Sequence, residues 1–180
     1  MKVFLIAAIS IDGFIAQHTN QSPTEWNSAE DKAFFRETTQ KMGVMVMGSA
    51  TFSTIGFPLP KRLNVVYSSK SKAEFEHQFN LTPDQTSADK LRVTTLEPRA
   101  LCEQLATEGF DQIALCGGSS IYTQFMQANM VDKILLTVEP VIFGQGVKLF
   151  SQAIKTTLKL VSSKQLNETG TLLLEYDCKK

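Results

Sequence analysis

The sequence opens on KVFLIAAISIDG (residues 2–13), in which a continuous apolar run is cut off by Ser10 and by Asp12-Gly13. An apolar run bounded in this way is typical of a strand that is buried on both faces of a sheet. The run is far too short to span a bilayer, and no small-residue cleavage site follows it. We therefore predict a buried first strand, no membrane partner and a cytoplasmic location.

Further apolar runs follow, and they alternate with stretches of helical period, which indicates strands joined by crossover helices. The predicted strands are Val3–Ile9, Val44–Met47, Leu63–Tyr67, Arg92–Thr95, Gln112–Leu115, Lys133–Val138, Thr157–Ser163 and Thr171–Asp177. The predicted helices are Ala29–Gln40, Ala50–Ile55, Pro98–Thr107 and Ser120–Gln127.

This alternation predicts the α/β class, with three layers: a mostly parallel central sheet of about eight strands and helices on both faces. Only residues 164–170 separate the last two predicted strands, which indicates an antiparallel C-terminal hairpin. Residues 71–89 are polar without clear periodicity, and we expect a surface excursion there. No linker or internal repeat divides the chain, so residues 1–180 are predicted to form a single domain.

The composition narrows the class of partner. The 18 basic and 18 acidic side chains cancel, and no long run of like charge suggests a surface for nucleic acid. A small-molecule partner is the expectation that remains. Cys102, Cys116 and Cys178 are widely separated and lack metal-ligand spacing, so reduced thiols and no metal are expected.

The first predicted helix carries an acid suited to chemistry. Helical spacing puts Asp31, Phe34, Phe35 and Thr38 on one face. If that face lines a cleft, desolvation raises the pKa of the Asp31 carboxyl, which can then hold or relay a proton near neutral pH. The alternative is structural, because with Ser28 as N-cap the Asp31 side chain could complete a capping box. The segment alone favours this alternative.

Two strand-to-helix junctions carry small residues, one over Met47–Thr51 and the other over Cys116–Tyr122. Glycine lets a backbone approach a ligand closely, and helix N-termini offer N–H groups to phosphate oxygens. Two such junctions in one sheet would suit a dinucleotide. Neither matches G-x-G-x-x-G, so an ordinary Rossmann dinucleotide domain is not supported.

The segment Thr54–Arg62 mixes apolar residues with two prolines and ends in a cation. Ile55 and Leu59 could wall a pocket there while Arg62 pairs with a ligand carboxylate. The alternative, favoured without further context, is a rigid surface loop with solvated basic residues.

Three other side chains add little to the chemistry. His18 and His77 each stand in a polar stretch without an activating Ser or Cys, so a hydrolytic triad is unsupported and both are expected to be solvated. Trp26 is either a ligand-facing ring or a core plug, and the second is the commoner use.

Taken in order, these pieces resemble dihydrofolate reductase and its superfamily relative, the reductase domain of riboflavin biosynthesis. The resemblance runs collinearly over roughly residues 2–150. It rests on Ala7–Ala16, Trp26–Phe35, Val46–Gly48 with Thr51–Phe52, Ile55–Gly56 with Pro58–Pro60 and Arg62, Ser68–Ser69, Gly117–Gly118 with Ile121–Tyr122, and Leu136–Thr137.

The resemblance implies an enzyme, an NADPH-dependent oxidoreductase that reduces 7,8-dihydrofolate to tetrahydrofolate by hydride transfer to the pterin C6. Asp31, supported by Thr137, would bind the 2-amino and N3 edge of the pterin and favour protonation at N5. Arg62 would pair with the glutamate carboxylate. The implied substrate-binding residues are Ile6, Ala8, Trp26, Phe35, Ile55, Leu59 and Arg62.

The resemblance also implies a cofactor site with a cis Gly117-Gly118 peptide. Its implied members are Ala8, Ile15, Gly48, Ser49, Ala50, Thr51, Ser68, Ser69, Lys70, Cys116, Gly117, Gly118, Ser119, Ser120, Ile121 and Tyr122. Ser49 and Ser120 replace frequent arginines, which weakens the preference for NADPH and keeps NADH as an alternative. Lys32 stands where an apolar pocket residue is usual.

Three functions stay open. Asp31 and Arg62 together favour dihydrofolate reduction, whereas residues 139–150 look more like the riboflavin-pathway reductase, whose substrate is 5-amino-6-(5-phosphoribosylamino)uracil. A nucleotide-binding protein without turnover is the third reading. The sequence is also compatible with a homodimer built on the C-terminal half.

Overall fold

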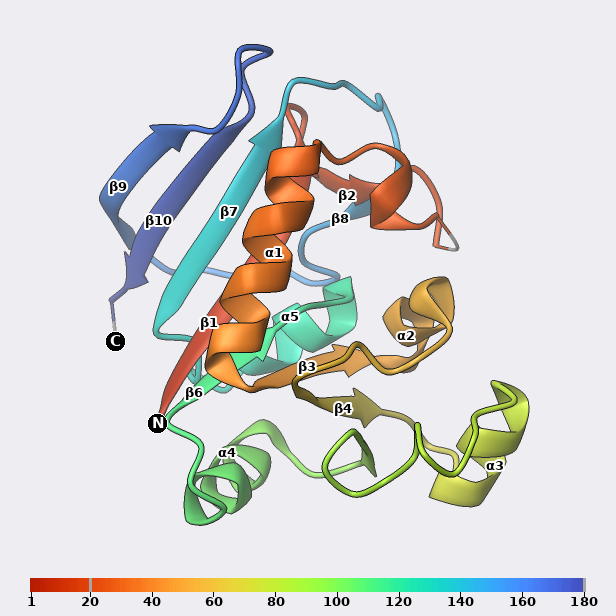
Figure 1. The fold of residues 1–180 in the computed structure, drawn as a ribbon. Coiled ribbons are helices and arrows are strands. Elements are labelled where there is room, and N and C mark those ends of the chain that lie inside the picture. The colour runs from red at the N-terminus through yellow and green to blue at the C-terminus, as the bar shows by residue number, and fades with distance from the viewer. Residues whose placement is uncertain (20, 180) are drawn as a thin grey trace.

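The computed structural model describes residues 1–19 and 21–179 of the chain. Its centre is an eight-stranded sheet of order β5-β4-β3-β6-β1-β7-β10-β9 (Figure 1). The strands of this sheet are β1 (Lys2–Ser10), β3 (Val44–Gly48), β4 (Leu63–Tyr67), β5 (Leu91–Thr94), β6 (Gln112–Leu115), β7 (Lys133–Glu139), β9 (Leu158–Gln165) and β10 (Leu172–Cys178). Neighbours from β5 to β7 are parallel, and β10 runs antiparallel to both β7 and β9. The predicted fold class and C-terminal hairpin are therefore confirmed.

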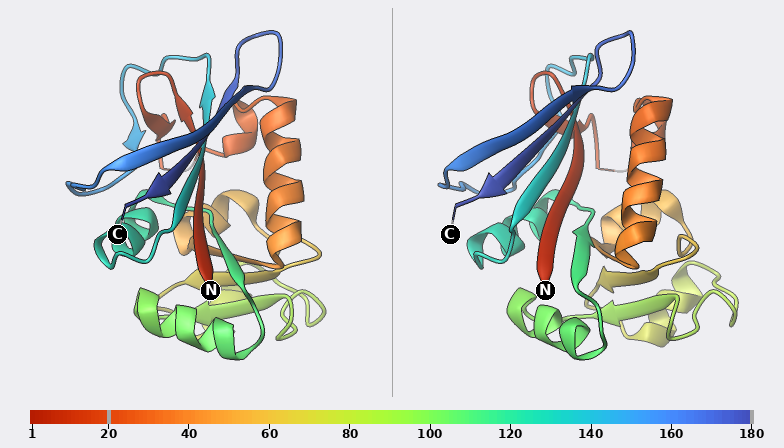
Figure 2. Two further views of the ribbon diagram at one scale, coloured as in Figure 1. Left: turned by 90° about the vertical axis from the view of Figure 1, so that its left-hand side faces the viewer. Right: turned by 60° about the vertical axis from the view of Figure 1, so that its left-hand side comes forward.

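Helices cover both faces of the sheet, and they are α1 (Ala29–Met42), α2 (Ser49–Ile55), α3 (Lys72–Gln78), α4 (Pro98–Thr107) and α5 (Ser119–Gln127), with a 3-10 turn η1 at Pro23–Glu25. In Figure 2, α1, α2 and α3 lie on one side of the sheet and α4 and α5 on the other. Strand residues alternate between the two resulting cores: Leu5 packs with α4 and α5, whereas Ile6 packs with α2 and α3. Within the described residues, no helix is long and apolar enough to cross a membrane.

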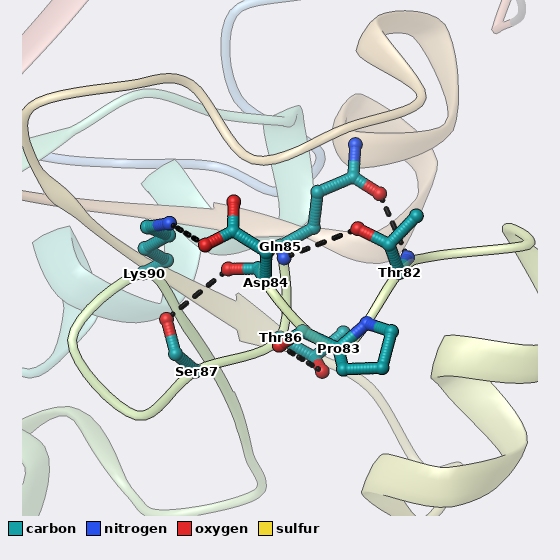
Figure 3. Close-up of polar contacts among 7 residues, drawn as sticks. All are labelled: Thr82, Pro83, Asp84, Gln85, Thr86, Ser87 and Lys90. Carbon is teal, nitrogen blue, oxygen red and sulfur yellow. Dashed lines mark hydrogen bonds and ion pairs between the residues drawn. The ribbon is translucent and has the colours of Figure 1, made fainter.

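The expected surface excursion at residues 71–89 holds a helix that the sequence pattern did not reveal. Ser71 and Glu74 form a capping box that starts α3, and Phe75 is buried with its ring 4.9 Å from that of Phe52. Figure 3 shows the turn that follows, in which Asp84 binds Lys90 and neighbouring side chains bond to nearby backbone. The helix was missed because a seven-residue segment with one buried apolar residue has no detectable period.

A second, two-stranded sheet was also not predicted. It pairs β2 (Phe14–Ala16) with β8 (Val147–Lys148). The carboxylate of Asp12 accepts hydrogen bonds from the backbone N–H of Phe143 and Gly144, at 3.2 and 2.7 Å. Residues 11–16, which follow β1, are thereby fixed against residues 141–148.

Candidate active site

A cavity of about 570 Å³ opens toward the carboxyl ends of β1, β3 and β6, where ligands of open α/β sheets bind. The helix α1, which forms one wall, packs against β6 and β3, and in Figure 1 it passes in front of β1. The lining residues are Ile6, Ala7, Ala8, Ile15, Ser22, Thr24, Trp26, Asn27, Asp31, Lys32, Phe35, Arg36, Gln40, Met45, Thr51, Thr54, Ile55, Phe57, Leu59, Pro60, Arg62, Cys116, Gly117, Gly118 and Tyr122.

Asp31 lies on this wall with 6% of its surface exposed. The Asn27 amide donates to its Oδ2 at 2.5 Å, and the hydroxyl of Thr137, a buried residue of β7, also hydrogen-bonds to it. Desolvation by burial raises the pKa of the Asp31 carboxyl, and the negative charge of Glu139 adds to the rise. The hydrogen bonds from Thr137 and Asn27 and the charge of Lys32 oppose it. The result is a carboxyl that can carry a proton at higher pH than an exposed aspartate.

Of the two hydrogen bonds that a capping box between Ser28 and Asp31 requires, only one is present. The Ser28 hydroxyl accepts the backbone N–H of Asp31 at 3.2 Å, as an N-cap does. The reciprocal bond of a capping box would run from the Ser28 backbone N–H to the Asp31 carboxylate. Instead, that N–H and the Ser28 hydroxyl both donate to Glu139 Oε1 at 2.8 Å, and Thr171 donates to Glu139 Oε2 at 2.7 Å. Because Glu139 takes this role, the Asp31 carboxylate is free to face the cavity.

The two small-residue junctions lie side by side, because β3 and β6 are neighbours in the sheet. The Gly48 backbone N–H donates to the Gly117 carbonyl at 2.7 Å, and the Gly117-Gly118 peptide is cis, as the resemblance implied. A Cβ on Gly48 would come within 3.1 Å of Ile121. Gly118 is the N-cap of α5 and supplies no side-chain cap. Gly117 and Gly118 thus leave the cavity wall without side chains next to the uncapped N-terminus of α5. This arrangement fits the pyrophosphate of a dinucleotide.

The opposite wall is the proline-rich loop that ends in Arg62. This side chain is 7% exposed; its Nε donates to the Pro60 carbonyl at 3.0 Å, and its Nη1 donates to the Thr39 hydroxyl of α1. Burial lowers the pKa of the guanidinium, and the nearby charge of Arg36 lowers it further. The buried Asn64 side chain fixes the loop through bonds to Leu59 and to the Arg62 and Lys90 carbonyls. Arg62 is thus not the solvated surface cation of the alternative interpretation.

Trp26 closes the cavity from the segment that precedes α1. Its ring meets that of Phe143 edge-on, with centroids 5.0 Å apart, so the anchored residues 141–148 support it. The indole Nε1 is buried and has no hydrogen-bond partner among the described residues. Trp26 is therefore a cavity-facing ring with a spare donor and not a core plug.

The structure brings together most of the residues assigned from the sequence, while their roles stay predictions. The predicted substrate-binding residues all line the cavity, with Asp31 and with Ile15, Thr51, Cys116, Gly117, Gly118 and Tyr122 of the cofactor set. The remaining cofactor candidates, which lie at strand ends and helix starts outside the lining, are Gly48, Ser49, Ala50, Ser68, Ser69, Lys70, Ser119, Ser120 and Ile121.

The predicted face of α1 needs a correction. Phe34 and Thr38 are not among the residues that line the cavity, and Phe34 is a half-buried ring that packs against the core on this side of the sheet. The residues that share the face of Asp31 are Phe35 and Thr39, at a spacing of four. His18 and His77 are exposed, as expected.

Sequence reasoning missed three residues of the site: Asn27, Thr39 and Glu139. Asn27 precedes Asp31 by four positions, a spacing that could have suggested their contact. Thr39 lies eight residues after Asp31, two helical turns along the same face. Glu139 lies more than a hundred residues from Ser28, and no local signal predicts that bond.

Comparisons with known proteins agree with this architecture. Residues 1–172 match the model of the RibD C-terminal domain family. Dihydrofolate reductase of Haemophilus influenzae is 32% identical over 139 residues, which cover 76% of this chain and 71% of that enzyme. An uncharacterized Bacillus subtilis protein, YwjB, is 25% identical over 174 residues, or 95% of each chain.

Solved structures show the same fold at lower identity. A putative riboflavin biosynthesis protein from a Shewanella species superposes over the full length of both chains with a TM-score of 0.73 and 19% identity. A Thermotoga maritima diaminohydroxyphosphoribosylaminopyrimidine deaminase/5-amino-6-(5-phosphoribosylamino)uracil reductase gives 0.76 and 18%; the match covers 99% of this chain but only 56% of that protein.

The eight-stranded sheet and the acid on α1 thus define the class, a dihydrofolate reductase-like reductase domain. Within that class, the chain belongs to the RibD C-terminal domain family.

Proposed function

We propose that this protein is an NADPH-dependent reductase of a pterin or related pyrimidine-bearing heterocycle, with 7,8-dihydrofolate as the first candidate substrate. The observation that carries the proposal is the buried Asp31 carboxyl, which neutral donors hold on the wall of a cavity that also reaches Gly117 and Gly118. A carboxyl in this setting matches the 2-amino and N3 edge of a pterin, which offers donors at hydrogen-bonding distance from each other.

The nicotinamide supplies a hydride to the ring carbon C6 when the cofactor is bound. Asp31 binds the pyrimidine edge, and its raised pKa lets it bring a proton to the complex, so that N5 gains a proton as C6 gains the hydride. Thr137 and Asn27 fix the orientation of the carboxyl. Phe35, with Ile55 and Leu59 opposite, would enclose the rings and exclude water.

The cofactor is assigned to the glycine junctions. Gly117 and Gly118 leave room for the backbone to approach the pyrophosphate, and the N-terminus of α5 offers N–H groups to it. Ser68 and Lys70, at the end of β4, are candidates for the 2′-phosphate that distinguishes NADPH from NADH. Lys70 is the one cation of residues 68–70, and its Nζ donates to the Gln78 side chain at 2.7 Å.

A second candidate substrate is 5-amino-6-(5-phosphoribosylamino)uracil. The family match extends to residue 172, whereas the Haemophilus dihydrofolate reductase aligns over only 139 residues. The segment over residues 139–150, which resembles the riboflavin-pathway reductase, supports Trp26 at the cavity mouth. Both substrates contain a pyrimidine ring with N–H donors. The uracil has a carbonyl at the position of the pterin 2-amino group, so Asp31 would accept only from a ring N–H of the uracil.

The test follows absorbance of NADPH and of NADH with dihydrofolate and with the aminouracil phosphate in parallel. Oxidation of NADPH with either heterocycle, and tetrahydrofolate or the reduced ribityl product as its product, supports the proposal. Tight NADPH binding without turnover of either substrate would instead favour a nucleotide-binding protein without catalysis.

A further inference from the structure

Glu139 is a buried acid that the proposed reaction has so far left without a role. It ends β7 opposite Ser10 of β1, and only 2% of its surface is exposed. No basic side chain in residues 1–19 and 21–179 forms an ion pair with it. A buried carboxylate without a cation is costly unless hydrogen bonds satisfy its oxygens, so its partners indicate what it does.

The two oxygens of Glu139 join three segments of the chain. Oε1 accepts hydrogen bonds from the Ser28 backbone N–H and hydroxyl, both at 2.8 Å, and Oε2 accepts one from the Thr171 hydroxyl at 2.7 Å. The Ser28 hydroxyl oxygen in turn accepts the Asp31 N–H at 3.2 Å. The Thr171 hydroxyl oxygen accepts the Asn167 amide at 2.9 Å. Glu139 therefore meets donors only, an arrangement that suits an ionised carboxylate.

The Ser28 hydroxyl thus connects the two buried acids of this region. It donates to Glu139 and accepts from the backbone of Asp31, so both carboxyls lie near the first turn of α1. A negative charge at a helix N-terminus is favourable, because the free backbone N–H groups there carry partial positive charge. Glu139 supplies that charge from β7, while the Asp31 carboxyl stays on the cavity wall.

Other titratable or charged side chains face Asp31, either by lining the cavity with it or by contact near the start of α1. Besides Glu139 they are Glu30, Lys32 and Arg36 of α1, Cys116 after β6, Tyr122 of α5 and Arg62 of the proline-rich loop. Burial raises the pKa of the Cys116 thiol and of the Tyr122 phenol, so both are uncharged at neutral pH. Glu30 is exposed, and its carboxylate accepts the Asn167 amide at 3.0 Å.

Two of these charges act on Asp31 in opposite directions. Burial is the first cause of the raised pKa of Asp31, and the negative charge of Glu139 adds to the rise. The charge of Lys32 opposes it. Lys32 is exposed and screened by water, whereas Glu139 is enclosed in protein, where charges interact more strongly. Without the charge of Glu139, Asp31 should therefore lose its proton at lower pH.

We propose that Glu139 is a positioning residue for the reductase reaction: it holds the start of α1 through Ser28, which leaves the Asp31 carboxyl to the substrate, and it places a second buried negative charge beside that carboxyl. The inference rests on the proposed function for the use of the Asp31 proton. That proton passes to N5 of the pterin as C6 gains the hydride, and Asp31 regains a proton from water. With Glu139 in place, the proton stays available to a higher pH.

Three variants separate the charge of Glu139 from its hydrogen bonds. Glu139→Gln keeps the shape and an oxygen for Ser28 but removes the charge. Glu139→Asp keeps the charge but is one methylene shorter, so it cannot make the same bonds. Glu30→Gln is the matched control, since it removes an exposed acid from the same helix turn. Urea unfolding checks that each variant folds.

The proton on Asp31 is followed directly by ¹³C NMR of protein labelled at the aspartate side-chain carboxyls. The signal of Asp31 is the one missing from Asp31→Asn. Its midpoint should move to lower pH in Glu139→Gln and stay near the wild-type position in Glu139→Asp and Glu30→Gln. An unmoved midpoint in Glu139→Gln would overturn the inference. An equal move in Glu139→Asp would assign the effect to the hydrogen bonds and overturn the role of the charge.

The pH profile of kcat/KM tests the consequence for the reaction, with NADPH and whichever heterocycle is turned over. On the alkaline limb, kcat/KM should fall about three- to tenfold in Glu139→Gln, because Asp31 then loses its proton earlier. On the acid side it should change by less than about twofold, as should Glu30→Gln at every pH. A lowered NMR midpoint with an unchanged alkaline limb would show that the reaction does not use this charge.

Failure of this inference differs from failure of the proposed function. Trp26 is the single tryptophan of the chain and lines the cavity, so titrations of its emission report heterocycle binding without turnover. If neither heterocycle changes that emission or oxidises NADPH, the reductase proposal fails and the role of Glu139 in the reaction fails with it. If a heterocycle is reduced and the Asp31 midpoint does not depend on Glu139, the reductase proposal stands and this inference is wrong.

Discussion

Two cavities of nearly equal volume flank the loop over residues 58–62, and their charges are arranged in opposite ways. The first, of about 570 Å³, is the candidate active site; the second, of about 580 Å³, lies where β3, β4 and β5 begin. The second holds two ion pairs: Lys90 binds Asp84 at 2.7 Å, as Figure 3 shows, and Arg92 forms two 2.9 Å bonds with Glu108. Lys61 and Arg62 also line it and form no ion pair with the described residues. In the first, the acid meets neutral donors and the cations lack acidic partners among the described residues.

Because the two volumes are nearly equal, cavity size does not identify the site in this molecule. In the second cavity two acids already pair with cations and offer less to a ligand, whereas the first holds a buried acid and cations without ion pairs among the described residues. Location agrees with charge, because ligands of α/β sheets bind at the carboxyl ends of the strands.

Replacing Asp31 by Asn should have the largest effect. The amide keeps the shape but cannot carry the proton, so kcat/KM should fall about 10²- to 10⁴-fold. The free energy of unfolding at pH 7 should not fall, because the substitution removes a carboxyl whose charge is costly to bury. Steady-state kinetics and urea unfolding on the same sample measure both. A destabilised variant with normal turnover would show that Asp31 only caps the helix.

The pH dependence of stability checks the same residue. The folded-state pKa of Asp31 lies above its ordinary value of 3.8, so the folded protein binds more protons than the unfolded chain between the two values. This group therefore lowers stability as pH rises through that window. The gap between Asp31→Asn and wild type should widen in favour of the variant over the same range, and a constant gap would contradict the raised pKa.

The loop over residues 58–62 separates the two cavities, and its stability can be tested next. Asn64 is fully buried and satisfies the Leu59 N–H and the carbonyls of Leu59, Arg62 and Lys90. Asn64→Ala should cost about 2–4 kcal/mol in the free energy of unfolding, because several buried backbone groups lose a partner. Urea unfolding measures the loss, and the exposed neighbour Lys61→Gln is the control. A loss below about 0.5 kcal/mol would mean that the loop does not depend on Asn64.

The strands of the central sheet could be predicted from the sequence, whereas most side-chain contacts at the site could not. Strand runs such as Val44–Met47 are continuously apolar because both faces are buried, and that property is local. Asp31 and Arg62 could be singled out from the types and spacing of nearby residues. The partners that decide their roles could not: Glu139 reaches Ser28, and Thr39 meets Arg62, only once β7 and the proline-rich loop have docked against α1. The short pair β2 and β8 was missed for the same reason.

The β2–β8 pair, which lies beside the first cavity, can be weakened at Gly146, a residue that does not line the cavity. Gly146 has φ of 157°, and a Cβ there would collide with the backbone carbonyl of Ala16, so Gly146→Ala should cost about 1–3 kcal/mol and weaken the β2–β8 pair. Gly144→Ala is the matched control, since its φ of 74° is also positive but its Cβ would meet nothing within 4 Å. Urea unfolding measures the loss of unfolding free energy. The emission of Trp26, which contacts Phe143, reports whether residues 141–148 have moved. Equal losses in both variants would show that backbone conformation, and not the close approach, is what matters.

The smallest effect is expected in the second cavity. Arg92→Met removes the bidentate pair with Glu108, whose side chains are 25% and 32% exposed, so the free energy of unfolding should fall by only about 0.5–1 kcal/mol. The hydrogen bond from Arg92 is the first cause of the lowered pKa of Glu108, and the pair therefore contributes above the ordinary carboxyl pKa of 4.5 and is lost as pH falls through the lowered value. Wild type and variant should converge in acid and differ near neutrality, while turnover and Trp26 titrations stay unchanged at every pH. Arg92 lines the second cavity and not the first, so its replacement removes no side chain of the candidate active site. A loss of ligand binding in Arg92→Met would therefore mean that the second cavity takes part in function.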